Sequence, residues 1–111
     1  NYARCHDDIG WGFEKDIIKD LGMDPEAHKQ FIIQFMEGKF PGSFAKGELY
    51  EFNPETLDAR NSGTMASLCG LEEALEKKDR YKLELAVKRI LLLNSVIISY
   101  TGITVVMRLG P

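Results

Sequence analysis

This 111-residue sequence has few cysteines, no excess of basic over acidic residues and no long apolar run. Two cysteines, Cys5 and Cys69, are too few for a disulfide framework, so we expect reduced, buried thiols in a cytoplasmic protein. With 14 basic and 17 acidic residues and no basic cluster, the composition argues against nucleic-acid binding. The apolar stretch over 90–98 contains Asn94 and Ser95 and is shorter than the ~20 residues of a membrane-spanning helix, so no membrane partner is expected.

The residues that are present suit one small globular domain, with 44% hydrophobic and 28% charged residues. Apolar spacing predicts helices over 14–21, 25–37, 65–77 and 80–100. Weaker signals predict strands over 1–5, 58–62 and 103–107, and a strand or hairpin within 43–52. Asp24 and Pro25 are typical of a helix start and Gly38 of a helix end.

The last predicted helix is apolar on nearly every side in its second half, so we expect burial on more than one face. The strand predicted over 103–107 is β-branched and apolar, which is typical of a buried parallel strand. The order is therefore a strand end, a long helical insertion, a helix and a strand. A βα unit of a barrel with an insertion in its βα loop has this order.

Residues 1–11 (NYARCHDDIGW) resemble the end of the seventh barrel strand in the α-amylase superfamily, glycoside hydrolase family 13, with amylosucrases as the most similar members. Further segments are similar to the same family: 28–31 (HKQF), 42–47 (GSFAKG), 53–54 (NP), 58–60 (DAR), 62–64 (SGT) and 92–110. The resemblance implies a mainly α fold with a few short strands, a fragment from the C-terminal side of a (β/α)8 barrel. Residues 1–13 would end strand seven, 14–70 would form the loop-7 insertion, and 71–111 would supply helix seven and strand eight.

The chemistry of this family depends on carboxylates. A retaining glycosidase needs a nucleophile and an acid/base group on either side of the scissile bond. The resemblance places both upstream of Asn1 and only a third carboxylate here, with Asp7 as the transition-state stabiliser. It implies that His6 hydrogen-bonds the same sugar ring and that Asp8 closes the base of the glucose pocket. The implied substrate is sucrose or an α-glucan, without cofactor or metal, and the chain alone would be inactive.

The resemblance also matches Lys29, Phe31, Asp58 and Arg60 to the acceptor side of the pocket. Lys29 stands where the family has arginine, and lysine lacks the bidentate fork that arginine offers to a ligand. Asp58 and Arg60 also fit an exposed ion pair, which contributes little to stability. Phe31 also fits a simple core position, because it lies on the apolar side of its predicted helix.

Other interpretations of the same residues remain open. The segment His6–Asp8 fits a solvated turn or a helix cap. Cys5, His6 and Asp7 are metal-ligand types, although adjacent residues of a strand point in different directions. The chain as a whole also fits a non-catalytic helical module that self-associates through the apolar surface of the 80–100 helix. The family pattern is also broken at Pro41, where the family has Asp, and at the ending over 107–111.

Overall fold

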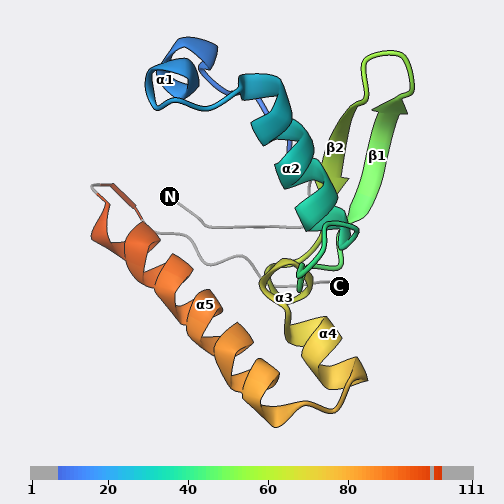
Figure 1. Ribbon diagram of the computed structural model, residues 1–111. Coiled ribbons are helices and arrows are strands. Elements are labelled where there is room, and N and C mark those ends of the chain that lie inside the picture. The colour runs from blue at the N-terminus through green and yellow to red at the C-terminus, as the bar shows by residue number, and fades with distance from the viewer. Residues whose placement is uncertain (1–7, 101, 104–111) are drawn as a thin grey trace.

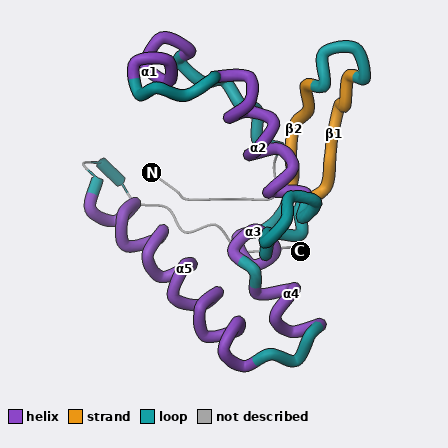
Figure 2. Tube along the Cα trace, viewed as in Figure 1, coloured by secondary structure: helices purple, strands orange, loops and turns teal. Residues whose placement is uncertain are grey.

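The computed structural model of this chain describes residues 8–100, 102 and 103. The strand predicted over 1–5, and that over 103–107 apart from its first residue, lie outside these residues. The described part forms five helices and one hairpin (Figures 1 and 2). Their bounds are α1 Lys15–Asp20, α2 Pro25–Glu37, β1 Glu48–Asn53, β2 Asp58–Ser62, α3 Met65–Cys69, α4 Leu71–Glu76 and α5 Arg80–Ser99.

Helix α2 has the bounds that its capping residues predict. The Asp24 side chain accepts a hydrogen bond from the Glu26 backbone N–H, and Pro25 is the first helical residue. Gly38 ends the helix in the left-handed conformation, with φ of 89°. Ile33 on the inner face is only 3% exposed, and α2 packs against both strands of the hairpin (Figure 1).

The hairpin is antiparallel and irregular near its tip. Regular pairing from Glu48↔Ser62 is interrupted between Tyr50 and Asn53, where Glu51 has a φ of 52°. The strand predicted within 43–52 therefore begins only at Glu48. In β2 the side chains alternate, so that Ala59 and Asn61 are buried against α2 while their neighbours are more exposed.

The prediction of one continuous helix over 65–77 is wrong, because the chain turns at Gly70 and forms two short helices, α3 and α4. Gly70 has a φ of 96°, which L side chains rarely adopt. A Cβ atom at this position would lie 3.1 Å from both the Phe44 side chain and the Arg89 guanidinium. Glycine is therefore required at the corner, and the two short helices point in different directions (Figure 1).

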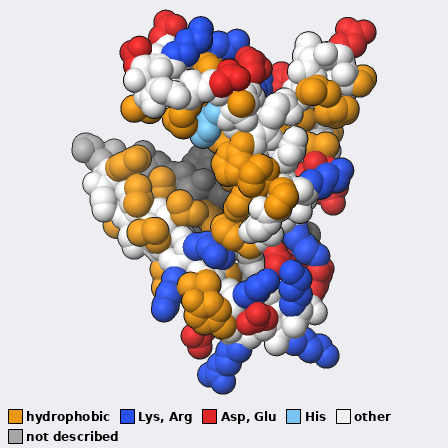
Figure 3. All heavy atoms as spheres, in the orientation of Figure 1, with side chains coloured by type: hydrophobic (Ala, Val, Ile, Leu, Met, Phe, Trp, Pro, Cys, Tyr) orange, Lys and Arg blue, Asp and Glu red, His pale blue; other side chains and the backbone are white. Residues whose placement is uncertain are grey.

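The prediction that the second half of α5 is buried on more than one face is also wrong for the described residues. Ala86 is the one residue of α5 that counts as fully buried in the described part. Leu91, Leu92 and Ile98 are 62%, 64% and 64% exposed. Helix α5 packs on α3 and α4 along one side, and Figure 3 shows hydrophobic side chains gathered on its surface. One neighbouring layer is too little to cover a helix that is apolar all round.

Candidate functional site

A polar cavity of about 460 Å³ lies between the loop over 10–12, helix α2 and the hairpin. We call it the hairpin pocket, and its lining residues are Gly10, Trp11, Gly12, Lys29, Glu51, Asp58, Ala59 and Arg60. Three of the residues that the sequence predicted for a sugar site, Lys29, Asp58 and Arg60, thus share one cavity. They come from α2 and from β2, segments that lie some thirty positions apart in the chain.

Two ion pairs line the hairpin pocket. Lys29 Nζ lies 2.8 Å from Asp58 Oδ1, and Arg60 Nε lies 3.3 Å from Glu51 Oε2. Asp58 and Arg60 are therefore each paired with another residue. Because all four side chains are at least partly exposed, these pairs contribute little to stability. Their main effect is to place acceptors and donors side by side on one wall.

The carboxyl group of Asp58 is ionised at neutral pH. The hydrogen bond from the Lys29 ammonium group is the largest cause that holds the pKa of Asp58 below its ordinary value, and the positive charge of Lys29 and the Ala59 backbone N–H act in the same direction. An ionised carboxylate accepts hydrogen bonds and has no proton to donate. Asp58 is therefore suited to binding a hydroxyl group and unsuited to general-acid chemistry.

Asn61, which the sequence reasoning missed, fixes the wall of the pocket. Its side chain is 0% exposed, accepts a 2.7 Å hydrogen bond from Trp11 Nε1 and donates a 3.3 Å bond to the Ile33 carbonyl. Its backbone exchanges hydrogen bonds of 2.7 and 3.1 Å with Ile9. The inward alternation of Ala59 and Asn61 is the sequence signal that could have identified it, since buried polar side chains are nearly always hydrogen-bonded.

Phe31 lies in a row of aromatic rings and does not line the hairpin pocket. Its ring centre is 4.7 Å from that of Phe40 and 6.3 Å from that of His28, and His28 is 5.3 Å from Phe13. Trp11 continues the row, stacked on Phe13 at 6.2 Å. Phe31 is 39% exposed, so the row presents ring surface beside the pocket without Phe31 entering it.

Of the three residues that the resemblance assigns to glucose binding, the structure describes Asp8 alone. Asp8 is exposed and is absent from the lining, while His6 and Asp7 lie outside the described residues. Their implied roles therefore stay predictions. In the described ranges, no group of three or more His, Cys, Asp and Glu residues is arranged to hold a metal ion. No helix there has both the length and the apolar character needed to cross a membrane.

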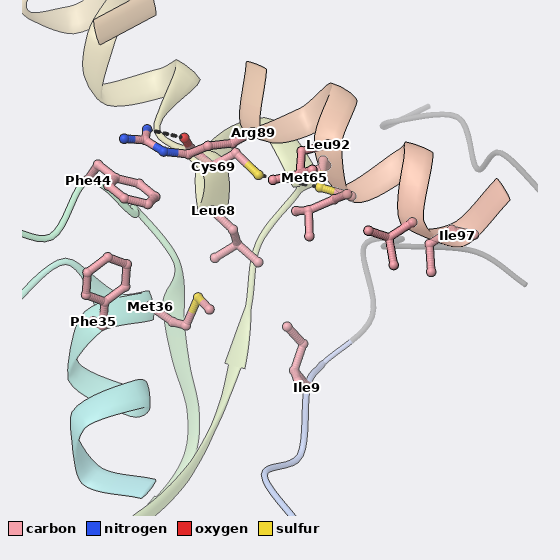
Figure 4. Close-up of a pocket in the computed structure, with 12 residues that line it drawn as sticks. Ile9, Phe35, Met36, Phe44, Met65, Leu68, Cys69, Arg89, Leu92 and Ile97 are labelled. Atoms are coloured by element: carbon pink, nitrogen blue, oxygen red, sulfur yellow. Dashed lines mark hydrogen bonds between the residues drawn. The ribbon is translucent and has the colours of Figure 1, made fainter. Parts of the chain in front are cut away.

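A second cavity is an apolar groove of about 430 Å³ between α5, α3 and the end of α2 (Figure 4). Met65, Leu68 and Cys69 line it from α3, and Leu92 and Ile97 line it from α5. Burial raises the pKa of the Cys69 thiol above its ordinary value, so the thiol stays protonated at neutral pH. Among the described residues that line it, the groove therefore has no activated nucleophile, and its lining is mostly apolar.

No protein-family model matches this chain. The resemblance of 1–11, 28–31 and 58–64 to the α-amylase superfamily therefore stays a prediction. Segment 28–31 contributes Lys29 to the lining of the hairpin pocket, and segment 58–64 contributes Asp58, Ala59 and Arg60. Segment 1–11 contributes Gly10 and Trp11.

Proposed function

We propose that this chain forms the acceptor side of a carbohydrate-active enzyme that acts on sucrose or α-glucosides by retaining glucosyl transfer or hydrolysis. The observation that supports this function best is the hairpin pocket, where Lys29, Asp58 and Arg60 line one cavity with Trp11. Small-molecule sites combine a few placed polar groups with aromatic surface. This pocket offers both.

The pocket has complementary hydrogen-bonding groups for sugar hydroxyls. A hydroxyl group both donates and accepts, so it can bind between a carboxylate and a cation. Asp58 beside Lys29, and Glu51 beside Arg60, provide two such places. The Trp11 N–H is already bound to Asn61, so the indole is fixed and is left with its ring surface for a ligand.

The chain alone should bind sugar without cleaving it. The family resemblance places the nucleophile and the acid/base group outside these 111 residues, and covalent catalysis needs both. The test is sucrose turnover by the purified chain, for which we expect no release of glucose or fructose. Release that disappears in the Asp7→Asn variant would contradict the assignment of the chain as inactive alone.

Sugar binding is tested by titrating the ¹⁵N-labelled chain with sucrose and with maltose in proton–nitrogen correlation spectra. We expect the Trp11 indole signal and the backbone signals of 58–60 to shift with added sugar. Arg60→Gln should reduce these shifts, because it removes the positive charge and most of the N–H donors that Arg60 offers to the pocket. Arg80→Gln is the matched control, since Arg80 is 92% exposed at the start of α5. Equal behaviour of the two variants, or no shift in the wild type, would count against the proposal.

A second candidate function is self-association as a non-catalytic helical module. Six apolar side chains of α5 are between 41% and 64% exposed: Val87, Leu91, Leu92, Leu93, Val96 and Ile98. Leu92, Leu93 and Val96 line the apolar groove, whereas Val87, Leu91 and Ile98 form an outward ridge. We propose a second copy of the chain as the occupant, because α5 supplies both an outward apolar ridge and one wall of the apolar groove.

Sedimentation velocity over a range of protein concentrations tests this candidate. A dimer should form in the wild type and weaken at least tenfold in Leu91→Gln, which removes an apolar side chain from the outward ridge. Lys88→Gln, on an exposed position of the same helix, is the control and should leave the dimer intact. A folded chain that stays monomeric at all concentrations excludes the second copy as the occupant of the α5 surface.

A further inference from the structure

The guanidinium group of Arg89 is held in one orientation by two neighbours. Its central carbon lies 3.6 Å from the centre of the Phe44 ring, a cation–π contact. Its Nη1 donates a 3.0 Å hydrogen bond to the Cys69 carbonyl at the end of α3. Figure 4 shows the guanidinium beside Phe44, turned away from the apolar side chains of the groove. The group is therefore preorganised, since little side-chain freedom remains to be lost on binding.

Arg89 has no carboxylate partner among the residues that the structure describes, although it is half-buried there. The Cys69 carbonyl is its one hydrogen-bond acceptor in that part of the chain, so most of its N–H donors are unused. A partly desolvated cation without a counter-charge is costly. The other two cations nearby, Lys77 and Lys82, are both paired with Glu73.

A cavity of about 390 Å³ lies beside this guanidinium, between the start of α5, α4 and the turn over 42–44. We call it the Arg89 cavity. Three cations, Lys77, Lys82 and Arg89, line it together with two carboxylates, Glu73 and Asp79. Both ammonium groups bind the same oxygen of Glu73, at 2.7 and 3.2 Å. The lining therefore has one positive charge more than its carboxylates balance.

The carboxylates of this cavity are committed to structural contacts. The Asp79 side chain accepts from the Lys82 backbone N–H and caps α5. The Glu73 side chain is 9% exposed and is shared by its two lysines. Neither is bonded to Arg89, so Arg89 is the cation of this cavity without a carboxylate partner among the described residues.

We propose that the Arg89 cavity binds a phosphate group, with the fixed guanidinium as its main donor. The planar fork of arginine matches two oxygens of a phosphate, and Lys82, which lines the same cavity, adds a point charge. The cavity shares no lining residue with the hairpin pocket, so the two sites are independent. The proposal does not depend on the sugar-binding function.

The test is calorimetric titration with inorganic phosphate at constant ionic strength, with Arg89→Gln and Lys88→Gln side by side. Arg89→Gln removes the guanidinium group with its positive charge, and the shorter glutamine amide does not extend as far as Arg89 Nη1. Lys88 is exposed, does not line the cavity and gives the same change in net charge. We expect phosphate affinity to fall at least tenfold in Arg89→Gln and to change less than twofold in Lys88→Gln. No phosphate binding by the wild type, or equal losses in both variants, overturns the proposal.

A second measurement covers the case in which Arg89→Gln fails to fold. In the wild type, added phosphate should shift the Arg89 Hε resonance, and an unchanged resonance at saturating phosphate overturns the proposal. Lys82→Gln should weaken phosphate binding several-fold, because it removes another cation from the lining of the cavity. Acetate serves as the competing oxyanion. Tighter binding of acetate than of phosphate overturns the assignment to a phosphate group.

Discussion

The indole N–H of Trp11 donates a 2.7 Å hydrogen bond to the fully buried side-chain oxygen of Asn61, fifty positions along the chain. This bond joins the loop over 10–12 to β2, and the other end of the same amide joins β2 to α2 through the Ile33 carbonyl. The walls of the hairpin pocket are therefore fixed by one side chain that does not itself line the pocket.

Replacing Asn61 with Leu should destabilise the fold by about 2–4 kcal/mol, because two buried hydrogen-bonding groups of Trp11 and Ile33 lose their partner. Urea unfolding followed by fluorescence measures this directly, since Trp11 is the single tryptophan. The emission of the folded variant should also move to longer wavelength as the indole loosens. Gln34→Ala, at an exposed position of α2, should change stability by less than about 0.5 kcal/mol. If Asn61→Leu is as stable as this control, the Asn61 side chain does not hold the loop, the hairpin and α2 together.

Local signals in the sequence were enough to predict α2. Its start depends on Asp24 and Pro25 and its end on Gly38, and all three act through backbone geometry within one turn of the helix. Asp79 acts in the same local way, because its side chain caps α5 by accepting from the Lys82 backbone N–H. The bounds of β2 also agree with prediction, because turn residues precede it and a helix cap, Thr64, follows.

The break at Gly70 and the assembly of the hairpin pocket could not be predicted from the sequence, because both depend on contacts between distant segments. Apolar spacing is compatible with one helix over 65–77, and the break at Gly70 depends on Phe44 and Arg89, which approach it from other segments. Asn61 likewise depends on Trp11, which lies fifty positions away in the chain. Lys29, Asp58 and Arg60 were identified through a family resemblance, and their convergence on one cavity depends on how α2 packs against the hairpin. Phe31 faces another side of α2 and lies outside that cavity.

If the proposed function holds, arginine in place of Lys29 should strengthen sugar binding in the hairpin pocket. Lys29→Arg keeps the positive charge beside Asp58 and adds a planar fork that can bind the carboxylate and a hydroxyl group together. We expect a severalfold tighter dissociation constant for sucrose or maltose in the nuclear magnetic resonance titration. Lys29→Met should weaken binding instead. If both variants bind as the wild type does, Lys29 does not contact the sugar.

The same Lys29→Met variant tests the charge state of Asp58. Without the ammonium group, the pKa of Asp58 should rise toward its ordinary value of 3.8. Since the folded-state pKa is depressed, the Lys29–Asp58 pair stabilises the fold above the unfolded-state pKa, and this effect is lost as pH falls through the lower folded-state value. Carbon-13 detection of the Asp58 carboxyl group follows the titration. An identical titration curve in wild type and Lys29→Met would show that the 2.8 Å contact does not persist in solution.

Glu73 should make the packing of α4 on α5 sensitive to acid. Hydrogen bonds from Lys77, then from Lys82, hold the pKa of Glu73 below its ordinary value of 4.5. Its stabilising effect is complete above the unfolded-state pKa and is lost as pH falls through the depressed folded-state value. Glu73→Gln should therefore lower stability by about 1–2 kcal/mol at pH 7. The difference between variant and wild type should shrink when urea unfolding is repeated at progressively lower pH below 4.5. A difference that is independent of pH would assign the loss to packing instead of charge.

Gly70→Ala should be the most damaging conservative change at the corner between α3 and α4. The backbone there has a φ of 96°, and the added methyl group would lie 3.1 Å from the Phe44 side chain and from Arg89 Nη1. Backbone strain of this kind costs about 1–3 kcal/mol before any displacement of the ring is counted. Gly12→Ala is the matched control, because a Cβ atom there has nothing within 4 Å. Urea unfolding should show a loss of at least about 2 kcal/mol for Gly70→Ala and a change below about 0.5 kcal/mol for Gly12→Ala. If Gly70→Ala instead unfolds like the wild type, α3 and α4 can join into the continuous helix that apolar spacing alone predicts, and the Phe44–Arg89 contact is not what fixes the corner.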